Sequence, residues 1–128
     1  MTTQPTVLIA DDSPTLRRIV STVLERAGFT VVTAEDGVEA VQGVFRTQPD
    51  AVILDIRMPG MSGVEFLRQI RSDTRLSQLP VGIVTGDYFL SEQVLAELGA
   101  LGAVVRYKPV WMADLISLAR SLLSGTIS

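Results

Sequence analysis

The chain has 128 residues, the length of one typical domain, and a formal net charge of −3. This acidic balance disfavours direct nucleic-acid binding, which needs clustered positive charge against the phosphates. Cysteine and histidine are both absent, which excludes disulfides, thiolate metal sites and a histidine general base. Since the sequence has neither an apolar run of about 18 residues nor a basic leader before an apolar run, we expect no membrane span and a cytoplasmic location.

Hydrophobic residues make up 47% of the chain and aromatic residues only 5%, so a mostly aliphatic core is expected. A chain of this length buries enough surface to fold without disulfides. We expect a single domain over 1–128, with its core at about 6–124.

Apolar runs alternate with helical patterns from the start of the chain. Residues 6–10 are apolar from Val7 onward, which indicates a strand buried on both faces. Ser13 suits the N-cap of the helix that follows it, and a β-branched strand is expected over 30–34. Asp36 and Glu39 have the spacing of a capping box, so a second helix should begin there and end near residue 47.

The middle of the chain continues this alternation. Residues 51–55 predict a third strand, and the segment that follows contains Pro59 and Gly60 and must be a loop. Ser62 and Glu65 form a second capping box, which predicts the start of a third helix.

The last part of the chain predicts a strand over 80–85, a helix over about 91–98, a strand over 103–107 and a helix over about 112–123. The chain therefore contains five βα units. Strands that alternate with helices form a parallel sheet with right-handed crossovers and helices on both faces. The predicted class is a doubly wound α/β fold, in which the functional site lies beyond the carboxyl ends of the strands.

Four of the five predicted strands end in residues that carry chemistry. Asp11 and Asp12 follow the first strand, Asp55 ends the third, Thr85 ends the fourth, and Lys108 follows the fifth. Because the carboxyl ends of parallel strands lie along one edge, we expect three carboxylates, a hydroxyl and an ammonium to meet there. Each residue alone has a structural explanation, but four such coincidences on four strands are improbable.

Three carboxylates crowded at one place repel one another. Two like charges about 4 Å apart raise the energy by roughly 4 kcal/mol at an effective dielectric constant near 20. Lys108 supplies one compensating charge, and a hard divalent cation with oxygen ligands would supply the rest. The sequence therefore predicts a Mg²⁺ site, at which a phosphoryl oxygen could also bind the metal ion.

Four short motifs together strongly resemble the response-regulator receiver family. They are Asp11-Asp12, the run from Asp55 to Gly63, Thr85-Gly86 and Lys108-Pro109, and their spacing agrees with that family over nearly the whole chain. The resemblance implies a flavodoxin-like (βα)5 fold, a doubly wound parallel sheet in the strand order 2-1-3-4-5. It also implies a two-component response regulator rather than an enzyme that turns over a substrate.

The resemblance implies a role for each matched residue. Asp55 would be the phosphoacceptor, taking the phosphoryl group from a phosphohistidine of a sensor histidine kinase or phosphotransfer protein. The Mg²⁺ ligands would be the Asp12 and Asp55 carboxylates and the Arg57 backbone carbonyl, with Asp11 acting through a metal-bound water. Phosphoryl transfer depends more on positioning and charge neutralisation than on covalent machinery, so such a site suffices.

Three more residues would hold the phosphoryl group. Lys108 would pair with Asp55 and then with a phosphoryl oxygen. The Thr85 hydroxyl and the Gly86 backbone N–H would hold another oxygen, and the Lys108–Pro109 peptide bond would be cis. The surface of the last two helices and the strand between them would then rearrange to control a downstream target protein or a separate output chain. The protein would be a monomer or a phosphorylation-dependent dimer.

The usual switch aromatic of the family is missing. Receivers usually carry an aromatic residue three positions before the lysine, where this chain has Val105. Tyr107 lies two residues further and hence on the same face of the strand. We predict that Tyr107, or another aromatic such as Trp111, takes over the switch role; the alternative is that no aromatic switch exists here.

Two further features lie near the predicted site. Arg57 and Asp87 each stand two residues after a site residue, and as a candidate site-mouth pair they would restrict attack by water. The alternative is two unrelated solvated side chains. The apolar run 88–90 either packs at the start of the following helix or forms a partner surface.

Several other functions use a similar fold. A haloacid-dehalogenase-type phosphatase needs a second aspartate where Arg57 stands, so we expect slow self-hydrolysis and no turnover of small substrates. Neither nucleotide-binding glycine motif occurs, and the first loop carries two acids where a flavodoxin would bind phosphate. Two alternatives stay open, a receiver-fold binding module that ignores phosphorylation and a truncated transcription factor.

Overall fold

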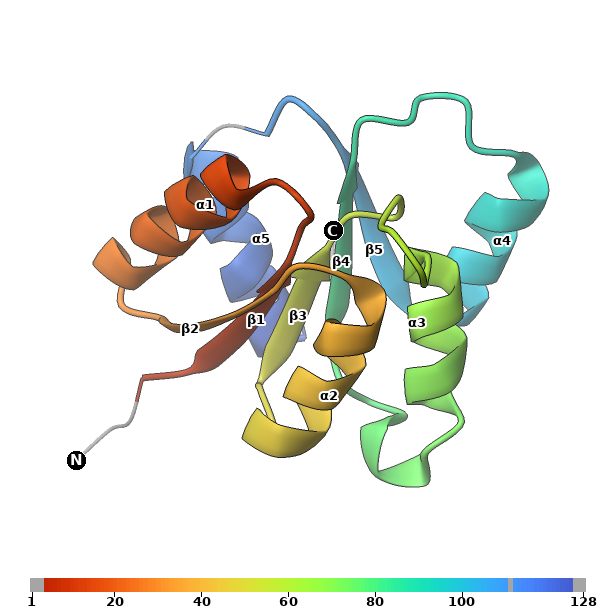
Figure 1. Ribbon diagram of the computed structural model, residues 1–128, viewed down its shortest axis with the longest axis horizontal. Coiled ribbons are helices and arrows are strands. Elements are labelled where there is room, and N and C mark those ends of the chain that lie inside the picture. The colour runs from red at the N-terminus through yellow and green to blue at the C-terminus, as the bar shows by residue number, and fades with distance from the viewer. Residues whose placement is uncertain (1–3, 111, 126–128) are drawn as a thin grey trace.

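The structure is a computed structural model that describes residues 4–110 and 112–125. In this part of the chain, five parallel strands form one sheet in the order β2-β1-β3-β4-β5, as predicted (Figure 1). The strands are β1 (Thr6–Ala10), β2 (Thr30–Ala34), β3 (Ala51–Leu54), β4 (Val81–Thr85) and β5 (Ala103–Tyr107). β4 begins one residue later than predicted, because Pro80 has no N–H to donate to the ladder.

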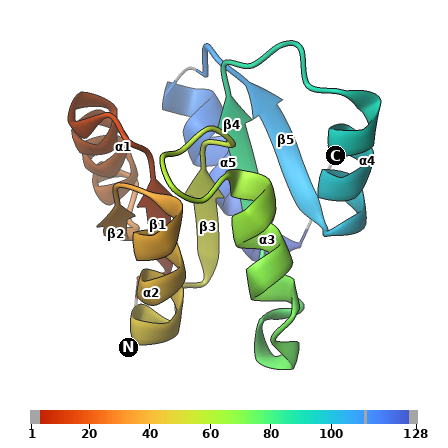
Figure 2. The same ribbon diagram turned by 45° about the vertical axis from the view of Figure 1, so that its right-hand side comes forward.

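Five α-helices of the described chain cover the two faces of the sheet. They are α1 (Pro14–Arg26), α2 (Gly37–Thr47), α3 (Gly63–Arg71), α4 (Glu92–Ala100) and α5 (Met112–Ser124). α1 and α5 pack on one face, whereas α2, α3 and α4 pack on the other (Figure 1, Figure 2). None of the described helices is long and apolar enough to cross a membrane.

The sheet separates two apolar cores. Successive strand residues point to opposite faces, so Leu8 joins the core beneath α2, α3 and α4, and Ile9 joins the core beneath α1 and α5. Phe66 of α3 is fully buried in the first core, and Leu122 of α5 is nearly so in the second. This two-sided covering is the physical reason why the central strands are continuously apolar.

Side-chain caps begin the helices where the capping patterns predict them. Ser13, Asp36 and Ser62 each accept a hydrogen bond from the backbone N–H three residues later, at 3.2, 2.8 and 3.2 Å. Ser91 caps α4 in the same way at 3.1 Å. These bonds satisfy N–H groups that the first helical turn leaves unpaired. The sequence patterns do not predict the short 3₁₀ turn at Thr74–Leu76.

Candidate functional site

The sheet brings the predicted site residues to one edge, at the top of Figure 1. β1 and β3 pair in a register that places Asp11 and Asp55 directly beyond their last paired residues. β4 and β5 pair to their ends, so Thr85 closes β4 and Lys108 follows β5. Residues far apart in the sequence therefore meet because the strands are parallel.

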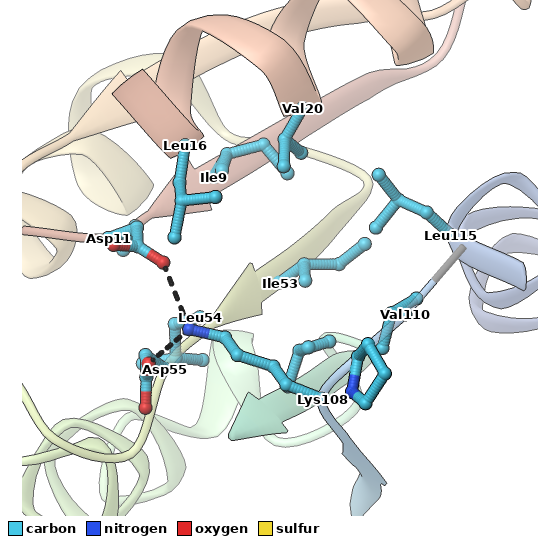
Figure 3. A pocket seen from close by; sticks show the side chains of 13 residues that line it. Ile9, Asp11, Leu16, Val20, Ile53, Leu54, Asp55, Lys108, Val110 and Leu115 are labelled. Carbon is cyan, nitrogen blue, oxygen red and sulfur yellow. Dashed lines mark hydrogen bonds and ion pairs between the residues drawn. The ribbon is translucent and has the colours of Figure 1, made fainter. Parts of the chain in front are cut away.

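Lys108 links two of the predicted carboxylates. Its Nζ lies 2.8 Å from Asp55 Oδ2 and 3.7 Å from Asp11 Oδ2 (Figure 3). Only 33% of the Lys108 side chain is exposed, and only 13% and 15% of the Asp55 and Asp11 side chains. Burial by itself would lower the pKa of Lys108. The hydrogen bond to Asp55 and the charges of Asp55 and Asp11 outweigh burial and raise that pKa above its ordinary value.

Backbone N–H groups orient the two acids. Asp55 Oδ1 accepts a hydrogen bond from Arg57 N–H at 3.1 Å, and Asp11 Oδ1 accepts one from Ser13 N–H at 2.9 Å. In both cases the carboxylate closes a tight turn with the residue two positions later. The directions of the carboxylates are therefore set by the loops before a ligand binds.

The backbone around Lys108 is tied to β4. Its N–H donates to the Thr85 carbonyl at 2.8 Å, and the Lys108–Pro109 peptide bond is cis, as the resemblance implies. Gly86 is exposed beside it, and a Cβ on Gly86 would lie 3.8 Å from Lys108 Cδ. That is an ordinary contact, so crowding does not explain glycine at this position.

The predicted gathering of three carboxylates is only partly present. Asp11 and Asp55 meet at Lys108, whereas Asp12 is exposed. Across residues 4–110 and 112–125, no three acidic side chains lie close enough together to hold a metal ion. The ammonium of Lys108 lies near both acids and offsets one of their two negative charges. Carboxylate and carbonyl oxygens completed by waters are the ligands that Mg²⁺ takes, so the donor set fits this ion by its chemistry.

A polar cavity of about 360 Å³ adjoins this cluster. The residues that line it are Asp55, Arg57, Thr85, Gly86, Asp87 and Lys108. Each of them is a predicted site residue. Since one water takes about 30 Å³, the space admits a phosphoryl group together with several waters.

A chain of hydrogen bonds runs along the mouth of the cavity. Thr85 is fully buried, and its Oγ1 accepts a hydrogen bond from Asp87 N–H at 3.1 Å. Asp87 Oδ2 accepts from Arg57 Nε at 2.8 Å and also from Arg57 Nη2. The N–H of Phe89 and then the Arg57 guanidinium lower the pKa of Asp87 below its ordinary value. The Arg57–Asp87 pair is thus present, and 77% of the Arg57 side chain is exposed.

Close backbone contacts fix the loop after Asp55, and this loop positions Arg57 at the cavity. Gly60 has φ +79°, in the left-handed region that favours glycine. Gly63 N–H donates to the Ile56 carbonyl at 2.8 Å, and a Cβ on Gly63 would lie 2.9 Å from Ile56 Cα. A larger residue at Gly63 would therefore displace the loop that carries Arg57.

An apolar cavity of about 370 Å³ lies behind the acidic cluster. Leu16 and Val20 of α1 and Leu115 of α5 line it, together with Ile53 of the sheet (Figure 3). This apolar wall reduces the screening of the charges on Lys108 and its acids, because few polar groups are available on that side.

Tyr107 makes a contact that sequence patterns do not reveal. Its ring stacks on Tyr88, with centroids 5.7 Å apart and planes at 17°. Val105 packs against the core beneath α2, α3 and α4, on the face that alternation predicts. Trp111, the other candidate aromatic, lies outside the described residues. The structure thus gives Tyr107 a partner, Tyr88, in the loop that follows Thr85.

The apolar run 88–90 divides between the two predicted interpretations. Leu90 packs against the core beneath α2, α3 and α4. Phe89 is 93% exposed, and Tyr88 is largely exposed as well. Leu90 therefore anchors the loop in the core, whereas Tyr88 and Phe89 present aromatic surface to solvent.

Arg17 is a residue at this edge that the sequence analysis does not identify. Its Nη1 donates to the Asp11 carbonyl oxygen at 2.6 Å, and its Nη2 lies 3.8 Å from Glu35 Oε2. Helical side chains lean toward the helix N-terminus, so an arginine in the first turn can reach back to the preceding loop. Because the acceptor is a backbone carbonyl, no residue pattern in the sequence indicates this contact.

Comparisons with known proteins agree with this geometry. The family model for the response regulator receiver domain matches residues 7–120. The chemotaxis protein CheY of Pseudomonas aeruginosa is 39% identical over 103 residues, which cover 78% of this chain and 82% of that protein. The probable transcriptional regulatory protein TcrX of Mycobacterium tuberculosis is 36% identical over 121 residues, which cover 94% of this chain and 50% of that protein. The chain thus spans about half the length of several curated relatives.

Solved structures show the same fold. The chemotaxis response regulator CheY4 of Vibrio cholerae matches with a TM-score of 0.85 at 33% identity, covering 94% of this chain and 100% of that one. A response regulator receiver domain protein from Clostridium thermocellum matches with a TM-score of 0.83 at 30% identity, covering 94% and 95% of the two chains. With the strand order, the strand-end residues and the family match in agreement, this chain belongs to the response regulator receiver domain family.

Proposed function

We propose that Asp55 accepts a phosphoryl group from a phosphohistidine of a partner kinase or phosphotransfer protein, in a Mg²⁺-dependent reaction. The observation that carries this proposal is the polar cavity in which Asp55 Oδ2 and Lys108 Nζ lie 2.8 Å apart. Receiver domains generally depend on Mg²⁺, and response regulators interact with histidine kinases and output domains. These general properties of the family support the proposal.

In the proposed reaction, a carboxylate oxygen of Asp55 attacks phosphorus and forms the new O–P bond. The N–P bond of the phosphohistidine breaks, and its electron pair stays on the departing imidazole nitrogen. Lys108 exchanges its hydrogen bond to the carboxylate for one to a phosphoryl oxygen, which keeps positive charge beside the developing negative charge. Mg²⁺, when bound, supplies further positive charge to the phosphoryl oxygens. Its ligands would be Asp12, Asp55 and the Arg57 carbonyl, with Asp11 acting through a water.

The Thr85 hydroxyl can hold a second phosphoryl oxygen. Its oxygen accepts Asp87 N–H, so the hydroxyl proton can be donated to the anion. A shift of Thr85 toward the phosphoryl group would move Asp87, and with it Tyr88, which stacks on Tyr107. This connection would transmit phosphorylation to the surface of α4, β5 and α5 and so control a partner.

We expect slow self-hydrolysis instead of turnover of small substrates. Arg57 stands where an aspartate-based phosphatase needs its second acid. The Arg57–Asp87 ion pair also lines the mouth of the cavity, where it would restrict the approach of water to phosphorus. The site would therefore keep its phosphoryl group long enough for signalling.

The decisive test is incubation with Mg²⁺ and acetyl phosphate, followed by intact mass spectrometry. Asp55→Asn is the matched control, because it keeps the shape of the side chain and removes the nucleophilic charge. We expect wild type to gain one phosphoryl mass only with Mg²⁺, and the variant to gain none. A gain in Asp55→Asn would contradict the assignment. A folded, Mg²⁺-binding wild type that gains nothing from acetyl phosphate or a phosphorylated kinase would be a phosphorylation-independent binding module.

A further inference from the structure

We infer that Arg17 is a positioning residue for the Mg²⁺ site. It holds the peptide unit between Asp11 and Asp12, and it thereby sets the directions of both acidic side chains. The inference rests on the proposed function, because it concerns the same Mg²⁺ ion.

Arg17 reaches the acidic loop from the first turn of α1. Its Nη1 donates to the Asp11 carbonyl oxygen at 2.6 Å, a short hydrogen bond with a charged donor. Only 18% of the Arg17 side chain is exposed, so water competes poorly for this bond. Glu35, 3.8 Å from Arg17 Nη2, is 63% exposed and contributes little. The carbonyl of Asp11 is therefore the main partner of the guanidinium.

The Asp11 carbonyl belongs to the planar peptide unit that joins Asp11 to Asp12. Because that unit turns as one rigid plane, holding its carbonyl restricts ψ of Asp11 and φ of Asp12. Two other bonds hold the same loop: Asp11 N–H donates to the Ala34 carbonyl at 3.1 Å, and Ser13 N–H donates to Asp11 Oδ1 at 2.9 Å. Arg17 adds the contact at the peptide unit itself.

The direction of these acids matters because Mg²⁺ requires near-ideal octahedral geometry. Arg17 donates to a backbone carbonyl in this cluster, so it acts on the Mg²⁺ ligands through the peptide unit. Groups that orient metal ligands in this way typically affect metal affinity by about 10–100-fold. Removing Arg17 also removes a positive charge near the cation site, which by electrostatics alone would strengthen Mg²⁺ binding. The loss of positioning therefore predicts weaker Mg²⁺ binding in a variant without Arg17, whereas the loss of charge predicts tighter binding.

The test is a Mg²⁺ titration in which the backbone amide NMR shifts report binding. It is done at constant ionic strength and without any phosphoryl donor. We expect Arg17→Gln to bind Mg²⁺ about tenfold more weakly than wild type. Arg18→Gln is the matched control, because Arg18 is the next residue of α1, is exposed, and carries the same charge. It should bind Mg²⁺ as well as wild type or slightly better. Arg17→Lys keeps one charged donor and should fall between wild type and Arg17→Gln.

Thermal unfolding without Mg²⁺ separates positioning from folding. A cooperatively folded Arg17→Gln variant with weakened Mg²⁺ binding supports the inference. Unchanged or tighter binding overturns it and leaves the proposed function intact. If Arg17→Gln does not fold, Arg17→Lys decides: weaker binding than wild type supports the inference, and equal binding overturns it. If wild type itself binds no Mg²⁺, the inference and the Mg²⁺ dependence of the proposed function both fail.

Discussion

The two halves of the proposed phosphorylation site are held in different ways. On the side of β1 and β3, Arg17 is mostly buried against the Asp11 carbonyl, and backbone N–H groups orient Asp11 and Asp55. On the side of the loop between β4 and α4, Thr85 is buried, but the outer partners of the contacts lie at the surface, where Arg57 and Tyr88 are largely exposed. From this difference we infer that, in the proposed function, the first half would position the phosphoryl group and the outer part of the second half would respond to it.

Removing the residue that joins the halves should have the largest effect. In Lys108→Ala, the attacking carboxylate and the incoming phosphoryl oxygen both lose the Lys108 ammonium. We expect phosphorylation by acetyl phosphate to slow by about 100-fold or more, the usual effect of losing one donor aimed at developing charge. Time-resolved intact mass spectrometry measures the rate, with Lys108→Arg as the variant that keeps the charge. A wild-type rate in Lys108→Ala would show that the junction has no part in the chemistry.

The same residue predicts a pH dependence of stability. Because the folded-state pKa of Lys108 is raised, its stabilising contribution is present below its ordinary value of 10.5 and is lost as pH rises through the raised value. The stability advantage of wild type over Lys108→Ala should therefore shrink only above about pH 10.5. Urea unfolding across alkaline pH measures it. If the stability advantage instead shrinks between roughly pH 6 and pH 9, the range of an ordinary histidine or α-amino group, a group other than Lys108 is responsible for it.

Thr85→Val tests the link from the cavity to the responsive half. Valine keeps the buried shape but leaves Asp87 N–H without its acceptor, so we expect the free energy of unfolding to fall by about 1 kcal/mol. Phosphorylation should then no longer shift the amide resonances of the loop after Thr85. Thr85→Ser retains the hydroxyl and should retain those shifts. Equal spectral responses in both variants would remove the hydroxyl from the proposed pathway.

The Arg57–Asp87 pair should have a smaller effect, on phosphoryl lifetime. We expect Arg57→Ala and Asp87→Asn each to hydrolyse the aspartyl phosphate several-fold faster, because water reaches the cavity more easily. Loss of the phosphoryl mass with time measures this. If the residues act as a pair, the double variant should be no faster than either single one. Unaltered lifetimes would mean that the pair is an ordinary surface contact.

Breaking the aromatic stack should have the smallest effect. Such pairs typically contribute about 0.5–1.5 kcal/mol beyond their buried area, and this one is partly exposed. We expect Tyr107→Ala and Tyr88→Ala to reduce the amide shifts that phosphorylation causes in β5 and α4, and to weaken phosphorylation-dependent partner binding. Phe89→Ala, an exposed neighbour outside the stack, is the control. Identical responses in all three would leave Tyr107 without a switch role.

The strand ends could be predicted because alternating strands and helices determine which residues share an edge. That reasoning places backbone positions, and so it located Asp55, Thr85 and Lys108 correctly. It does not determine where a side chain points in a loop, which is why the expected cluster of three carboxylates is present only in part. Arg17 was missed because its partner is a backbone carbonyl, which no residue pattern reveals. The Tyr88–Tyr107 stack depends on a loop conformation that periodicity does not specify.

Lys108 is also the only lysine in the chain. Supplying ¹⁵N-labelled lysine during growth would therefore place a single isotopic amine in the protein, hydrogen-bonded to Asp55 at the centre of the proposed site. Its ammonium resonance would respond when the carboxylate partner is replaced by a phosphoryl oxygen. The native chain could thus be followed by one assigned signal, with no substitution and no attached dye.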